Sequence, residues 1–121
     1  MRPEDHINTI LNLLNDHPLI VKVEIISQFA TDEERYVRLI AYFINGSELH
    51  LFEYIIKGRV EKYAYHLQDI EGKMILRYDN RPHHPEVETF PHHKHISSNS
   101  HPLPSRKPTL NKLLAEASRY I

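Results

Sequence analysis

Hydrophobic residues recur every three or four positions near both ends of the chain, which is the spacing of an amphipathic helix. The first such stretch predicts a helix over residues 4–16, ended by Asn15-Asp16-His17-Pro18. The second predicts a C-terminal helix over residues 109–120, with Thr109 as its N-cap. The two apolar stripes consist of Ile7, Ile10, Leu11 and Leu14, and of Leu110, Leu113, Leu114 and Ala117. Both stripes are expected to pack on the core.

Between these helices the pattern changes to short runs that are rich in β-branched and aromatic residues. Turn signals separate the runs at Asn45-Gly46, at Lys57-Gly58 and around Gly72. Because such short connections join antiparallel neighbours, the last four runs are expected to form a meander. Five strands are predicted, over residues 19–29, 35–44, 48–56, 60–68 and 73–79.

The Lys57-Gly58 turn allows the register of the sheet to be predicted, since opposite residues of an antiparallel pair share a face. A two-residue turn there places Phe52 opposite Tyr63 and Glu53 opposite Lys62. Extended through the other hairpins, this register assigns an aromatic core face to Val37, Leu39, Ala41, Phe43, Phe52, Tyr54, Tyr63, Tyr65, Leu67, Met74, Leu76 and Tyr78. The terminal helices are expected to cover this face.

The opposite face is predicted to be polar toward the last hairpin. There His66 is expected opposite Ile75 and diagonal to Arg77, with Lys62 opposite Asp79. Its apolar residues would be Ile40, Tyr42, Leu49 and Leu51. The predicted fold class is therefore α+β, a curved, mainly antiparallel five-stranded sheet with the N- and C-terminal helices on one face.

Prolines and histidines dominate the chain after the last predicted strand. Because proline lacks the backbone N–H that regular structure needs, residues 80–107 are predicted to be an irregular His/Pro-rich segment, with a plain linker at Ser97-Ser98-Asn99-Ser100. Six of the ten histidines lie within residues 63–95. Each imidazole brings two polar nitrogens that need partners when buried, so a core has little use for this density. This window is therefore expected to hold the functional site.

Composition is that of a globular domain. A chain of 121 residues has the size of one domain, so residues 1–121 are expected to fold as a single unit. The formal net charge of −1 argues against a uniformly basic nucleic-acid-binding surface, and the absence of cysteine excludes disulfides and thiolate-bound zinc. No apolar run approaches the roughly 20 residues that span a bilayer, so no membrane partner is expected and a cytoplasmic location is the default.

Four motifs in and just before the histidine-rich segment form a recognisable pattern. They are Tyr65-His66 with Gln68-Asp69, Arg77-Tyr78-Asp79-Asn80, Pro82-His83-His84-Pro85, and Thr89-Phe90-Pro91-His92-His93-Lys94-His95. With these motifs the chain resembles the TumE family of toxins from prokaryotic toxin–antitoxin pairs. The resemblance implies a small cytoplasmic toxin and a cognate antitoxin, expected to be a helix-turn-helix DNA-binding protein. It implies no particular reaction.

Histidines beside cations are suited to metal-independent cleavage of RNA. Cleavage through the 2′-hydroxyl needs a base, an acid and cations on the phosphate. In this hypothesis His66 and a loop histidine are base and acid, Arg77 and Lys94 bind the phosphate, and Asp79 orients a histidine. The loop histidines are His83, His84, His92, His93 and His95. The alternative is that His66 pairs with Asp79 only to satisfy a half-exposed face.

The same segment also has the residue types for a divalent metal site. His93 and His95 are close enough in sequence to supply two nitrogens, as are His92 and His95, and His83 or His84 with Asp79 could complete the set. The preferred ligands are His84, His93 and His95. Such a centre would activate water for phosphodiester hydrolysis. One argument against a metal site is that the side chains of neighbouring histidines point in opposite directions in an extended chain.

Two further functions remain open at this point. The segment could be a rigid strap that crosses the open sheet face and binds the antitoxin or a second copy of the chain, giving a homodimer. A nucleotide-transferring toxin is the other alternative, although the sequence has no glycine-rich phosphate loop.

Overall fold

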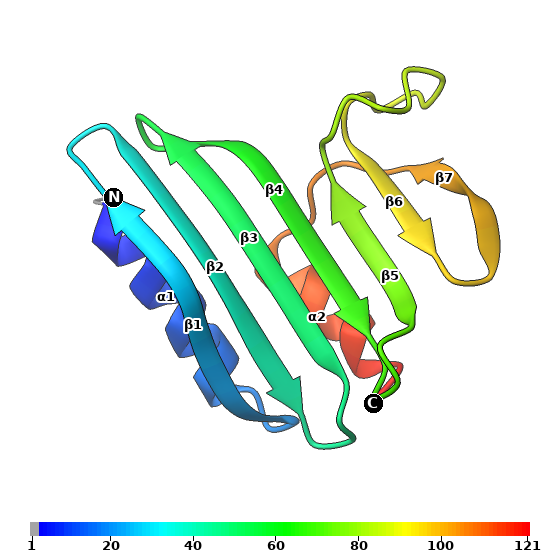
Figure 1. The fold of residues 1–121 in the computed structure, drawn as a ribbon, viewed down its shortest axis with the longest axis horizontal. Coiled ribbons are helices and arrows are strands. Elements are labelled where there is room, and N and C mark those ends of the chain that lie inside the picture. The colour runs from blue at the N-terminus through cyan, green and yellow to red at the C-terminus, as the bar shows by residue number, and fades with distance from the viewer. Residues whose placement is uncertain (1–2) are drawn as a thin grey trace.

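The computed structural model describes residues 3–121 as one antiparallel sheet with two helices (Figure 1). The sheet has seven strands, arranged in the order of the sequence. The helices are α1 (Pro3–Asp16) and α2 (Leu110–Ser118), and the strands are β1 (Ile20–Ala30), β2 (Glu34–Phe43), β3 (Glu48–Ile56), β4 (Arg59–Gln68), β5 (Met74–Asp79), β6 (His93–Ile96) and β7 (Asn99–Pro104). The predicted α+β class and both terminal helices are confirmed.

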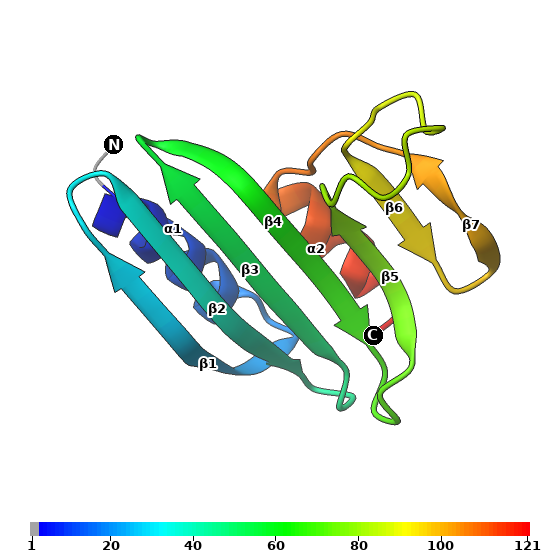
Figure 2. The ribbon, with the colours of Figure 1, turned by 45° about the horizontal axis from the view of Figure 1, so that its top comes forward.

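Both helices lie on the same side of the sheet, and the other side is uncovered (Figure 2). Their apolar stripes behave as predicted, because Ile10 and Leu14 of α1 and Leu113 of α2 are buried against sheet residues such as Leu39. The buried area provides most of the stabilisation, since removing apolar surface from water is the dominant favourable term in folding. Neither helix in the described part of the chain is long and apolar enough to cross a membrane.

The prediction of five strands is wrong in number, because β6 and β7 lie inside the segment predicted to be irregular. Strand β6 pairs with β5 from Leu76 opposite Ile96 to Asp79 opposite His93, and residues 97 and 98 form the turn into β7. Strand β7 can contain prolines because it is the edge of the sheet. Backbone N–H groups on the outer side of an edge strand have no neighbouring strand to bind, so a proline there removes no hydrogen bond from the ladder. The high content of proline and histidine therefore did not mean that this segment lacks regular structure.

The predicted register between β3 and β4 is wrong because of a β-bulge. The Lys57-Gly58 turn forms as expected, but the bulge leaves Glu61 unpaired between the pairs Ile55–Val60 and Tyr54–Lys62. One extra residue moves every following side chain of a strand to the other face. The observed pairs are Glu53–Tyr63 and Phe52–Ala64. The pairing of β3 with β2 is also one residue away from the predicted register, with Leu39 opposite Leu51, because the β2–β3 turn closes between Phe43 and Ser47. It is therefore β3 that lies with the other face inward: Leu49, Leu51 and Glu53 lie under the helices, and Phe52 and Tyr54 lie on the open face.

A second bulge changes the predicted pairing between β4 and β5. The pairs Leu67–Leu76 and Gln68–Met74 leave Ile75 without a partner. His66 therefore lies opposite Arg77 rather than Ile75, and Asp79 lies opposite Ala64 rather than Lys62. The predicted proximity of His66 and Arg77 survives, now as a direct cross-strand pair.

The corrected register buries a carboxylate beneath the helices. Glu53 is 3% exposed and is bound by the Tyr65 hydroxyl, by His6 Nε2 at 2.7 Å and by Lys107 Nζ at 3.9 Å. Burial favours the neutral acid, but hydrogen bonds from His6 and Tyr65 outweigh it and hold the pKa of Glu53 below its usual value. The carboxylate thereby links α1 and the segment before α2 to the middle of the sheet.

Candidate functional site

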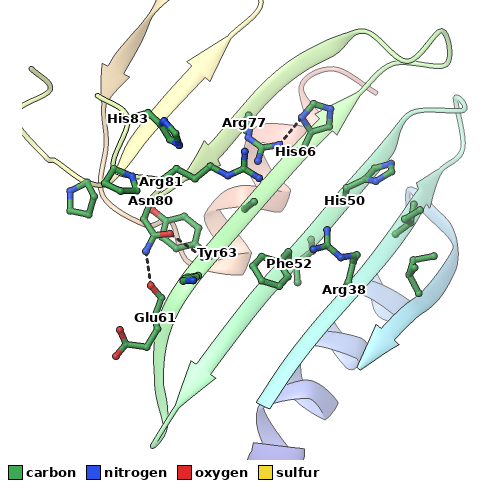
Figure 3. Close-up of a pocket in the computed structure, with 17 residues that line it drawn as sticks. Arg38, His50, Phe52, Glu61, Tyr63, His66, Arg77, Asn80, Arg81 and His83 are labelled. Carbon is green, nitrogen blue, oxygen red and sulfur yellow. Dashed lines mark hydrogen bonds between the residues drawn. The ribbon is translucent and has the colours of Figure 1, made fainter. Parts of the chain in front are cut away.

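A row of polar side chains crosses four strands on the open face of the sheet. Backbone pairing aligns His50 of β3 with His66 of β4, His66 with Arg77 of β5, and Arg77 with His95 of β6. Directly opposite residues share a face, so all four side chains project from the side that the helices leave uncovered. Figure 3 shows three of them, His50, His66 and Arg77, following one another across β3, β4 and β5.

A second row lies two residues further along each strand. It contains Arg38 opposite Phe52, and Asp79 opposite His93. The guanidinium carbon of Arg38 lies 4.7 Å from the centre of the Phe52 ring, which is a cation–π distance. This pair places a flat aromatic surface and a positive charge next to the first row.

His50, His66 and Arg77 of the first row and Arg38 and Phe52 of the second form the floor of a groove with a volume of about 900 Å³. The loop between β5 and β6 supplies one wall through Arg81, Pro82 and His83. Among the described residues that line the groove, the cations are Arg38, Lys62, Arg77 and Arg81, the imidazoles are His50, His66 and His83, and the one carboxylate belongs to Glu61. The groove is therefore electropositive and suited to an anion.

The wall-forming loop is held by local turns rather than by a ladder. Backbone hydrogen bonds join His83 N to Arg81 O at 2.8 Å and Phe90 N to Val87 O at 3.0 Å, and Val87 itself is buried. The side-chain amide of Asn80 fixes the start of the loop by donating to Glu61 O at 2.9 Å and accepting from Tyr63 N at 3.1 Å. It thus satisfies backbone groups at the bulge and continues the pairing of β5 with β4.

Asp79 is buried beneath the groove floor and holds the site together. It is 3% exposed, and its carboxylate accepts from Arg77 Nε at 2.8 Å and from the Arg81 backbone N–H at 3.0 Å, and lies 3.0 Å from His93 Nε2. Burial alone would raise its pKa, but these hydrogen bonds and the nearby positive charges outweigh it and lower the pKa of Asp79. The carboxylate therefore stays ionised and orients Arg77, and the histidine beside it is His93 rather than His66.

The surroundings of His66 favour the neutral form of its imidazole. Desolvation lowers its pKa, and the charge of Arg77 and the neighbouring His50 lower it further, against a smaller opposite effect of a hydrogen bond with Gln68. Nη1 of Arg77 lies 3.5 Å from His66 Nδ1, and because a guanidinium can only donate, Nδ1 carries the lone pair. A neutral histidine beside a fixed cation is the arrangement expected of a general base that acts on a phosphate ester.

Three of the predicted metal-ligating residues come together on the same face. His84 of the loop and His93 and His95 of β6 each offer a ring nitrogen, and these nitrogens lie within 4.8 Å of one another. The His93 and His95 side chains lie on one side of β6 because they are two residues apart in a strand. The three histidines do not line the groove but lie behind its wall, on the far side of Arg77.

Two of the predicted catalytic residues lie on the helix-covered face. Lys94 alternates with His93 and His95, so it points toward α2, where it binds Glu116 and lies 5.1 Å from the centre of the Tyr78 ring. His92 stacks on the Tyr63 ring, with its Nδ1 2.9 Å from the Tyr63 hydroxyl. The sheet separates both residues from Arg77, so neither can share a phosphate with it.

Sequence reasoning missed several groove residues, chiefly Arg38, His50, Phe52 and Arg81. The register error placed the side chain of Phe52, and with it that of His50, on the wrong face of β3. Arg38 was on the correct face, but nothing in the sequence connected it with a histidine site. A basic residue next to the Pro-His-His motif was the available signal for Arg81.

A family model described as Toxin TumE matches residues 10–121. The match includes both strand rows, the wall of the groove and the three clustered histidines. No curated protein and no solved structure matches the chain.

Proposed function

Because the chain belongs to the TumE family of toxins, which are the toxin components of toxin–antitoxin systems, we propose that it cleaves RNA in the groove on its open sheet face. The observation that carries this proposal is the position of Arg77 between two histidines of the groove, His66 on β4 and His83 on the loop (Figure 3). A base, an acid and a cation are thereby available around one phosphate.

The shape and charge of the groove suit a single strand of RNA. Four cations line it against one carboxylate, and phosphate neutralisation by Lys and Arg supplies most of the affinity for a nucleic acid. The Phe52 ring with Arg38 above it provides a surface on which an unpaired base can stack. An open sheet face with an aromatic platform is also how several RNA-binding modules take splayed bases.

The proposed reaction uses the substrate's own 2′-hydroxyl as the nucleophile. Arg77 Nη1, which faces His66 Nδ1 in the free protein, donates to the phosphate instead. The freed Nδ1 lone pair takes the proton of the 2′-hydroxyl, and the hydroxyl oxygen forms a bond to the adjacent phosphorus. Arg77 and Arg81 stabilise the charge that develops on the phosphate oxygens. The bond from phosphorus to the 5′ oxygen breaks, and His83 gives that oxygen a proton. The products are a 2′,3′-cyclic phosphate and a 5′-hydroxyl.

The end groups of the products test this proposal. Purified protein is incubated with a single-stranded RNA oligonucleotide and with the same sequence carrying a 2′-deoxy sugar at the cleaved position, with and without a chelator. We expect cleavage of the first only, independent of the chelator, to a fragment with a 2′,3′-cyclic phosphate. Cleavage of both strands, or fragments ending in a 3′-hydroxyl, would instead identify metal-dependent hydrolysis. Intact RNA with transfer of labelled nucleotide to a target would favour the nucleotide-transferring alternative.

A second candidate role, binding of the antitoxin, is supported by the edge strand β1. Four of its large apolar side chains are exposed, and among the described residues no strand pairs with its outer side. The exposed residues are Val21, Ile25, Ile26 and Phe29. A free apolar edge is the usual site for strand addition by a partner. The family implies a cognate antitoxin, and we propose that this partner, a helix-turn-helix protein, pairs with β1.

Charged substitutions on β1 should weaken antitoxin binding without affecting RNA cleavage. In the double variant Val21→Lys, Ile25→Lys, two charges would be buried by the partner, so we expect at least a tenfold higher Kd for the co-encoded antitoxin. Ile44→Lys, in the exposed β2–β3 turn, serves as the control. Unchanged antitoxin affinity in the double variant would rule out β1. A change of oligomeric state in the same variant would instead identify a homodimer through this edge.

A further inference from the structure

We propose that His84, His93 and His95 bind one divalent transition metal ion with the chemistry of zinc, and that this ion joins the loop after β5 to strand β6. The proposal concerns a second site beside the groove and does not depend on RNA cleavage. It starts from the geometry of the three rings. Their centres lie 4.9, 5.4 and 4.9 Å apart, and their planes meet at 75°, 67° and 89°.

One nitrogen of each ring lies within 4.8 Å of the other two, so the three rings offer nitrogens to a common centre. Zinc holds histidine nitrogens at about 2.0–2.1 Å, so the three nitrogens must approach one another by up to about 1.5 Å when the ion binds. Small rotations about side-chain bonds supply such a movement. His84 lies on a loop, which makes its approach the easiest of the three.

Two of the rings already have the outer partners that metal-bound histidines require. Nδ1 of His93 donates to the Pro91 carbonyl at 2.9 Å, and Nδ1 of His84 lies 3.2 Å from the Glu86 carboxylate. A carbonyl or carboxylate on one ring nitrogen fixes the tautomer and leaves the other nitrogen to face the metal. In both rings Nε2 is then the nitrogen available to the ion.

Asp79 adjoins the cluster at His93 but is not one of the residues whose ligand atoms lie within 4.8 Å of one another. Its Oδ1 lies 3.0 Å from His93 Nε2, while Nδ1 of the same ring donates to the Pro91 carbonyl. A metal ion on Nε2 takes the place of a proton there, because metal ligation requires deprotonated histidine. Asp79 then keeps its hydrogen bonds from Arg77 and from the Arg81 backbone N–H.

The position of the cluster makes it a structural site rather than the reaction centre. None of the three histidines lines the groove. His84 and the groove-lining Arg81 and His83 share one loop, and His93 and His95 belong to the sheet. An ion that joins His84 to β6 therefore fixes the wall of the groove.

Direct titration with zinc tests the site. Full-length protein is stripped with a chelator, transferred to chelator-free buffer and titrated with zinc chloride in a calorimeter, beside His84→Ala, His95→Ala and the control His101→Ala. His101 is exposed on β7, outside the cluster, so its variant reports zinc binding by surface histidines. We expect one equivalent of tight binding in the wild type and the control. We expect at least a tenfold loss of affinity in the other two variants.

Hydrogen exchange of the loop gives a second measurement that a folding defect cannot imitate. One equivalent of zinc should slow amide exchange in residues 81–92 of the wild type but not of His84→Ala, a variant of a loop residue that is expected to fold normally. Equal zinc affinity in all four proteins, or tight binding without any slowing in the loop, would overturn the proposal. Because neither measurement uses RNA, a failure here is separate from a failure of the cleavage proposal.

Discussion

Replacing His66 by alanine is expected to reduce the rate of RNA cleavage by about 10²–10⁴-fold, the usual contribution of a general base. The physical reason is the combination of a lowered pKa with the adjacent Arg77 guanidinium, which places a neutral imidazole next to the phosphate. The measurement is the single-turnover rate on a saturating RNA oligonucleotide. His101→Ala, on an exposed position of β7, is the matched control and should cleave at the wild-type rate.

The dependence of this rate on pH separates a base from a residue that only binds RNA. A base works in its deprotonated form, so the rising limb of the pH–rate profile should lie below 6.5, the ordinary pKa of histidine, because the pKa of His66 is lowered. In His66→Ala this limb should disappear, while the affinity for RNA changes little. A variant that retains the limb and the rate would remove His66 from the mechanism.

Replacing Asp79 by alanine is expected to lower the free energy of unfolding by about 3–5 kcal/mol, the cost of removing one partner from a buried ion pair. The carboxylate is almost fully buried and contacts Arg77, His93 and the Arg81 backbone, so its loss leaves several polar groups without a partner. Urea unfolding measures the difference. Glu88→Ala, an exposed carboxylate of the same loop, should change the free energy by less than about 0.5 kcal/mol.

The effect of Asp79 should also depend on pH in a defined direction. Its pKa in the folded protein lies below the ordinary value of 3.8, so the folded state holds the ionised form more strongly than the unfolded state does. The stabilisation is therefore complete above about pH 4 and is lost as the pH falls through the lowered pKa. The difference between wild type and Asp79→Ala should shrink in the same range. A difference that is constant down to pH 2 would mean that shape rather than charge matters at this position.

The helices and the first five strands were predictable because each depends on a local pattern. An apolar stripe such as Ile7, Ile10 and Leu14 is stable only when it packs on another apolar face. The Lys57-Gly58 turn is typical of a hairpin. The presence of His66 and Arg77 on the uncovered side followed from the same reasoning. These features depend only on residues that are close together in the sequence.

The sheet register was not predictable, because two bulges and the length of the β2–β3 turn decide it. Nothing at Glu61 or Ile75 marks either residue as unpaired, and nothing at Asn45-Gly46 shows that the turn closes between Phe43 and Ser47. The bulge in β4 is satisfied by the Asn80 side chain, a contact between residues 19 apart in sequence. Local sequence cannot reveal such a contact. The groove residues His50 and Phe52 were lost with the register.

Strands β6 and β7 were not predicted, and the reason is a different one. Apart from Ile96 and Leu103, their residues are histidine, lysine, asparagine, serine and proline rather than the β-branched and aromatic types that mark a strand. They are extended because β5 offers β6 an unpaired edge, so the sheet rather than their own propensity determines their structure. His93 and His95 were nevertheless predicted as ligands from their spacing, with His84 to complete the set, and the strand explains why His93 and His95 share a face.

The contacts of Asp79 have a thermodynamic consequence. One of its oxygens faces His93 in the histidine cluster, and the other holds Arg77 in the groove. Two ligands whose sites share a residue are linked, and the factor by which one changes the affinity of the other is the same in both directions. Zinc bound at His93 and RNA bound beside Arg77, as proposed, must therefore change each other's affinity by the same factor.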